Sequence, residues 1–118
     1  MPKSLYVDPS EVRAPGKESF KSIPVNQYKK TVKEVKLPMS YAGRYLAETD
    51  GGKGFVKLVV DTDKNRLVGC NMVGSYASEI IMTATMMVDT ELTPDRLKKL
   101  VFPHPTVAEI IREAIFHI

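Results

Sequence analysis

The chain has 118 residues, the length of one ordinary domain, and 43% of them are apolar, so it can bury a core. Its 17 basic and 14 acidic residues give a formal net charge of +3 with the two signs interspersed, which argues against a nucleic-acid-binding face. A single cysteine excludes an internal disulfide and a four-ligand zinc pattern. No apolar run approaches the ~20 residues of a membrane span. We therefore expect a soluble, cytoplasmic protein without membrane contact.

The N-terminal part of the chain reads as irregular, with two strand signals. Residues 1–24 are rich in proline, and the short "SLYV" stretch at 4–7 predicts an edge strand that ends at the following Asp-Pro pair. The "KKTVKEVKL" stretch at 29–37 alternates β-branched and charged residues and predicts a bulged or twisted strand. The "SYAGRYLAETDGG" stretch at 40–52 then reads as a loop or an irregular bend.

The middle of the chain carries the strongest strand signals. "GFVKLVVD" at 54–61 and "RLVGCNMVG" at 66–74 are rich in β-branched and apolar residues. The turn-forming "DTDKN" stretch separates them. The two segments therefore predict a β-hairpin.

The last part of the chain predicts three helices. "SYASEIIMTATMMVDT" reads as a helix that starts near Ser75 and is apolar on more than one side, which calls for cover on both sides. Thr93 as a cap and Pro94 at the first helical position predict a second helix, and Pro105 can open the third. Strands followed by helices indicate an α+β fold, with helices packed on one face of an antiparallel sheet. The expected apolar side of the last helix consists of Val107, Ile110, Ile111, Ala114 and Ile115.

One imidazole, that of His104, lies between Pro103 and Pro105, directly before the last helix. The two prolines restrict the backbone and keep His104 out of the helical region. Glu109 follows within the first turns, and helical side chains lean toward the N-terminus, so its carboxylate can reach the imidazole. A carboxylate-oriented histidine is a competent general base. The same spacing fits a structural turn histidine beside a solvated charge, and both readings stay open.

Other chemical signals are sparse. The sequence contains neither the G-x-G-x-x-G nor the G-x-x-x-x-G-K-[ST] phosphate loop. Cys70, in the middle of a strand, reads as a small buried hydrophobic residue, and His117 reads as a solvent-facing helix residue. Two separated histidines without further ligands do not predict a metal site, so we expect none.

The closing "HPTVAE" stretch resembles the C-terminal interface (dimerisation) domain of the pyridine nucleotide-disulfide oxidoreductases, and looks most like that of the dihydrolipoamide dehydrogenases. "YVDPSEV", "KLPMSYAGRYLAE", the "GFVKLVVD…NRLVGCNMVG" hairpin and "SYASEII" are similar to family segments in the same order. "EVRAPGKESFKS" departs from the family pattern. The resemblance implies the fold of an FAD/NAD-linked reductase dimerisation domain.

The resemblance also implies roles for three residues. His104 matches the catalytic histidine that handles the thiol proton of dihydrolipoamide, and Glu109 matches the carboxylate that hydrogen-bonds it. Pro105 matches the proline of a His-Pro bond that is typically cis and that brings the histidine backbone near the partner's flavin. In such a homodimer, His104 and Pro105 would contact the partner's FAD. FAD and NAD themselves belong to N-terminal domains of the parent enzyme, so we expect no cofactor in this chain.

We therefore expect residues 1–118 to form a single interface domain without FAD and NAD domains, inactive alone. Because the chain opens with Met1, it is either a piece of a longer enzyme or a free-standing gene product. The alternative is a stand-alone homodimeric binding or scaffold module, since an apolar helix surface also marks an interface. The third reading, an acid/base enzyme complete within this chain, lacks the convergent polar groups of a substrate pocket.

Overall fold

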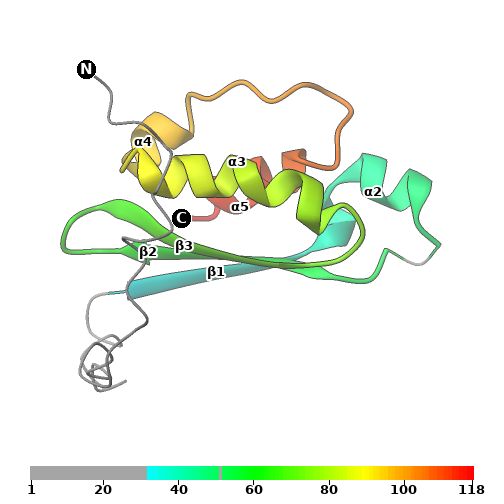
Figure 1. Cartoon of the computed structure of the whole chain (residues 1–118), viewed down its shortest axis with the longest axis horizontal. Coiled ribbons are helices and arrows are strands. Elements are labelled where there is room, and N and C mark those ends of the chain that lie inside the picture. Colours follow the sequence, from blue (N-terminus) through cyan, green and yellow to red (C-terminus); the bar gives the residue numbers. More distant parts are fainter. Residues whose placement is uncertain (1–31, 51) are drawn as a thin grey trace, which may run out of the picture.

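A three-stranded antiparallel sheet forms the base of the molecule. The computed structural model describes residues 32–50 and 52–118, and the expectations for residues 1–24 and for the start of the 29–37 strand lie outside them. The strands are β1 (Val32–Pro38), β2 (Phe55–Asp61) and β3 (Arg66–Val73), in the order β1-β2-β3 (Figure 1). Sheet and helices together confirm the α+β class.

Alternation along the strands explains which side of the sheet is covered. Val56, Leu58 and Val60 of β2 are buried, and the residues between them are half-buried. Side chains of a strand alternate between its two faces, so these three point into one core. The hairpin prediction is confirmed: the Asp61 carboxylate accepts the backbone N–H of Asp63 at 2.9 Å, and Asn65 has a φ of +50° at the end of the turn.

Of the two alternatives for the first strand, a bulge or a twisted strand, the described part of β1 shows no bulge. The β1–β2 register runs without a shift, and the irregularity lies instead between Val59 and Val60, in the β2–β3 pairing. The valine spacing in β1 misled the prediction because Val32, at the strand end, is only half-buried, whereas Val35 and Leu37 keep the inward period.

The 40–52 stretch is largely helical, so the expected loop is wrong. A 3₁₀ turn, η1 (Met39–Tyr41), leads into the helix α2 (Gly43–Glu48). Tyr45 is buried, and its hydroxyl donates to the Lys53 carbonyl and accepts the Ser75 backbone N–H at 3.3 Å. This anchoring between the hairpin and the next helix outweighs the weak helix propensity of the glycine at the helix start.

Two helices cover the same face of the sheet. The helix α3 (Ala77–Asp89) packs on β3, and α5 (Glu109–Phe116) packs on β1 and β2 (Figure 1). The short helix α4 (Pro94–Leu97) lies between them in sequence, and the Thr93 hydroxyl accepts the Arg96 N–H at 3.4 Å, which confirms the cap prediction. All five residues of the expected apolar side of the last helix are buried: Val107, Ile110, Ile111, Ala114 and Ile115.

The starts of the two longer helices differ from the predictions. The helix expected near Ser75 begins at Ala77, because Tyr76 adopts a left-handed φ of +66°. The last helix begins at Glu109 rather than at Pro105, because the chain turns once more before the helix. None of the helices in the described residues is long and apolar enough to cross a membrane.

Cover on both sides of α3 was expected, and the structure shows it on one side. Ala84 and Met87 are buried against the sheet. Met82 and Met86 each remain 61% exposed on the opposite side.

Candidate functional site: a histidine–glutamate pair before the last helix

His104 stands on a constrained turn at the surface. The Thr106 hydroxyl donates to the Pro103 carbonyl at 2.8 Å and closes the turn around the cis His104–Pro105 peptide. The side chain of His104 is 82% exposed. The backbone therefore presents the imidazole to solvent instead of packing it into the core.

Glu109 is the first residue of α5 and holds the imidazole from one side. Both of its carboxylate oxygens lie 3.0 Å from the imidazole Nδ1 of His104. One of them also accepts the backbone N–H of Thr106 at 3.0 Å. The side chain of Glu109 is only 17% exposed, so the carboxylate is the inner and better-fixed member of the pair.

The electrostatics of the pair keep the carboxylate ionised. The Thr106 backbone N–H is the main cause that lowers the pKa of Glu109; burial opposes it, and His104 and Arg112 lower the pKa further. A carboxylate only accepts hydrogen bonds, so the hydrogen of the neutral imidazole must lie on Nδ1. The other ring nitrogen, Nε2, is then the free base on a largely exposed side chain, as a general base requires.

Two crevices adjoin the pair and share His104, Glu109 and Arg112 in their linings. The larger encloses about 520 Å³ and extends along the chain between α4 and the histidine. The smaller encloses about 250 Å³ on the side of Tyr41 and Gly43. A small molecule can therefore reach the imidazole from either side of α5.

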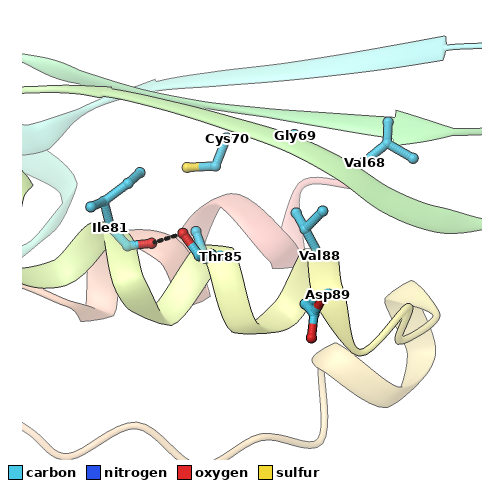
Figure 2. Close-up of a pocket in the computed structure, with 8 residues that line it drawn as sticks. Val68, Gly69, Cys70, Ile81, Thr85, Val88 and Asp89 are labelled. Carbon is cyan, nitrogen blue, oxygen red and sulfur yellow. Dashed lines mark hydrogen bonds between the residues drawn. The ribbon is translucent and has the colours of Figure 1, made fainter. Parts of the chain in front are cut away.

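Two other residues singled out in the sequence lie apart from this pair. Cys70 points from β3 toward α3 in a crevice of about 330 Å³ (Figure 2), where burial raises the pKa of its thiol to about 11. It is half-buried, which is less than expected. His117 is exposed as expected, and its Nδ1 donates to the Glu113 carbonyl at 2.8 Å.

Sequence reasoning missed Arg112 and a second polar cluster. Arg112 lies three residues after Glu109, a spacing that places two side chains on one helix face and could have revealed it. The second cluster joins Tyr76, Glu48 and Arg44 between α2 and the start of α3. No local spacing indicates it, since tertiary packing brings its residues together. Within 32–50 and 52–118, no three His, Cys, Asp or Glu residues are grouped as metal ligands.

Comparison with known proteins now gives the family. The sequence model of the pyridine nucleotide-disulphide oxidoreductase dimerisation domain matches residues 23–115. The chain is 36% identical over 85 residues to dihydrolipoyl dehydrogenase of Corynebacterium glutamicum, and 37% identical over 83 residues to that of Thermus scotoductus. Each match covers 70% of this chain and 18% of the relative, so the chain spans less than a fifth of these curated proteins. The chain belongs to the pyridine nucleotide-disulphide oxidoreductase dimerisation-domain family.

Solved structures agree on the fold. LpdA from Mycobacterium tuberculosis matches with a TM-score of 0.65 and 24% identity, over 73% of this chain and 18% of that one. The HOCl-induced flavoprotein disulfide reductase RclA from Escherichia coli, in its Cu(II) complex, matches with a TM-score of 0.70 and 22% identity, over 79% of this chain and 21% of that one. At these identities the likeness supports the fold alone.

Proposed function

We propose that this chain is the interface domain of a dihydrolipoyl dehydrogenase-like flavoenzyme, and that two copies form a homodimer. In it, His104 and Glu109 of one subunit would complete the disulfide site of the other. One observation carries the proposal: the His104 side chain is 82% exposed, yet its Nδ1 lies 3.0 Å from both carboxylate oxygens of Glu109. The identity to curated dihydrolipoyl dehydrogenases supports the substrate, dihydrolipoamide.

The pair is suited to move one proton. Nε2 of His104 would accept the proton of a substrate thiol, which leaves a thiolate as the nucleophile for disulfide exchange. The imidazolium that forms is stabilised by the ionised carboxylate of Glu109 at 3.0 Å. When the reaction runs in reverse, the same nitrogen returns the proton to the sulfur. His104 would thus act as the acid/base, and Glu109 would orient and stabilise it.

FAD and NAD would be held outside the described residues. Gly43 is the one glycine that lines either crevice beside His104, so neither crevice is lined by the glycine-rich loop of a phosphate-binding site. The exposed His104–Pro105 backbone fits a position beside a flavin that another part of the enzyme binds. Such a flavin would accept the electrons of the dithiol, while this chain would handle the proton.

A chimeric enzyme tests the proposal. The chain replaces the matched segment of the Corynebacterium glutamicum relative, and oxidation of dihydrolipoamide is measured. We expect an active dimer, and we expect His104→Gln to lower kcat by about 10²- to 10⁴-fold, the usual loss for a general base. His117→Gln is the matched control, since His117 is also an exposed histidine but lines neither crevice. Equal kcat values for the two variants would remove His104 from the mechanism.

The exposed methionines of α3 favour a second candidate, a homodimeric scaffold without catalysis. Met82 and Met86 are each 61% exposed on one helix face, as expected for a surface that a second copy covers. The scaffold and the enzyme domain both predict a dimer in sedimentation experiments. The two candidates give different results in the chimera, because a scaffold domain would assemble but would leave dihydrolipoamide unoxidised.

A further inference from the structure

The turn that carries His104 has few backbone hydrogen-bond donors. Pro103 and Pro105 have no backbone N–H, and the N–H of Thr106 is bound to Glu109 at 3.0 Å. In the part of the chain that the structure describes, no backbone N–H reaches the Pro103 carbonyl. This carbonyl instead accepts a hydrogen bond from the Thr106 hydroxyl, at 2.8 Å.

Thr106 lies where the exposed turn meets the core. Residues 103–105 are exposed, Thr106 is half-buried and Val107 is buried. The Val107 carbonyl also accepts the Ile110 N–H at 3.1 Å, which ties this side of the turn to α5. The backbone after Thr106 is thus held by the core, whereas the backbone before it is held through the Thr106 hydroxyl.

The carboxylate of Glu109 needs a second donor to fix its orientation. Both of its oxygens lie 3.0 Å from Nδ1 of His104, so this contact by itself does not select a rotation of the carboxylate. The terminal torsion of a glutamate side chain is broad and does not select one either. The Thr106 N–H binds only one of the two oxygens and therefore selects the rotation.

Thr106 thus links the turn to the imidazole through two of its own groups. Its hydroxyl holds the backbone of the turn, and its N–H holds the carboxylate of Glu109, which contacts His104. Because both groups belong to one residue, loss of the hydroxyl contact should also loosen the hold on the carboxylate.

We propose that Thr106 is a positioning residue of the His104–Glu109 pair, and that its hydroxyl keeps the hydrogen of the neutral imidazole on Nδ1. The inference rests on the proposed acid/base role of His104 and adds a residue to that site. Thr106 acts through Glu109 and takes no part in the proton transfer itself.

Substitutions at Thr106 in the 118-residue chain test the role of the hydroxyl. Thr106→Val and Thr106→Ala both remove it, the first with little change of shape, whereas Thr106→Ser keeps it. ¹⁵N spectra of the ring distinguish the two neutral tautomers of His104. We expect the Nδ1–H tautomer to dominate with threonine or serine, and both tautomers to be populated with valine or alanine. An unchanged tautomer in either variant without the hydroxyl overturns the proposal.

A second threonine provides the matched control. The Thr90 hydroxyl also donates to a backbone carbonyl, that of Met86 at 2.7 Å, but it lies at the end of α3 and lines neither crevice beside His104. Thr90→Val removes the same kind of contact and should leave the tautomer of His104 unchanged. Equal tautomer changes in Thr90→Val and Thr106→Val would assign the effect to general loosening of the chain and contradict the positioning role.

The chimeric enzyme distinguishes failure of this inference from failure of the acid/base role. Thr106→Val should lower kcat for dihydrolipoamide about tenfold with little change in KM, a loss that corresponds to about 1.4 kcal/mol, and Thr106→Ser should restore most of it. Full kcat in Thr106→Val beside a low kcat in His104→Gln contradicts the positioning role alone. If His104→Gln keeps full kcat, the acid/base role fails, and a changed tautomer in Thr106→Val still supports the positioning of the imidazole.

Discussion

The core face of α5 and the segment that leads into the helix differ sharply, although they are neighbours in sequence. Ile110, Ile111 and Ala114 have no solvent exposure, whereas the side chain of His104 is 82% exposed. Glu109 joins the two regions, since it starts the helix and holds the imidazole. The contrast separates a tightly packed helix from an exposed turn that carries the proposed acid/base pair, so the two should respond differently to substitution.

The largest expected effect comes from the buried side of this comparison. Ile111→Ala removes atoms that are fully buried and should lower the free energy of unfolding by about 2–5 kcal/mol. Val101→Ala, at a side chain that is 93% exposed, should change it by less than about 0.5 kcal/mol. Urea denaturation measures both values. Similar losses for the two variants would contradict the described burial.

The next largest effect concerns the reactivity of the Cys70 thiol, which is half-buried, whereas the His104 imidazole is exposed. Burial raises the pKa of Cys70 to about 11, so little thiolate is present at neutral pH. We expect iodoacetamide to alkylate Cys70 about 10- to 100-fold more slowly in the folded chain than in urea, allowing for its partial exposure. Mass spectrometry follows the reaction. Equal rates would show that the crevice between β3 and α3 leaves the thiol open.

A smaller effect is expected at the residue that joins the two regions. Glu109→Gln keeps an oxygen that can accept the Thr106 N–H but removes the charge, and should lower the free energy of unfolding by about 1 kcal/mol. The imidazole should then populate both neutral tautomers, which ¹⁵N spectra of the ring distinguish. A ring that keeps its hydrogen on Nδ1 would show that another group orients it.

The smallest effect is a pH dependence. Because the pKa of Glu109 is lowered on folding, its contribution to stability is present above the ordinary value of 4.5 and is lost as the pH falls through the lowered folded value. The amide proton of Thr106 should report this titration in NMR spectra, with a midpoint below 4.5. A midpoint at or above 4.5 would contradict the described hydrogen bond.

The sequence predicted those parts of the fold that depend on local period. The hairpin and the buried side of α5 follow from alternation and helical spacing, and both are confirmed. The helix α2 was missed because its stability comes from burial of Tyr45 against distant segments, which no local pattern records. The start of α5 was misplaced because Pro105 resembles a first helical residue but belongs to a turn.

The candidate site was predictable only in part, for the same reason. His104 and Glu109 are five residues apart, so side-chain direction indicated that the carboxylate can reach the imidazole, and the structure shows the contact at 3.0 Å. The larger crevice beside His104 was not predicted, because residues 98–102 and Arg112 line it together only after the chain has turned from α4 to α5. The acid/base role of His104 and the orienting role of Glu109 stay predictions for the experiments above.

The Glu109 carboxylate makes two contacts at once, and this links local unfolding of the helix start to the alignment of the imidazole. Glu109 fixes the imidazole and also satisfies the Thr106 amide just ahead of the first helical turn. Fraying of that turn and loss of ring alignment are therefore a single event.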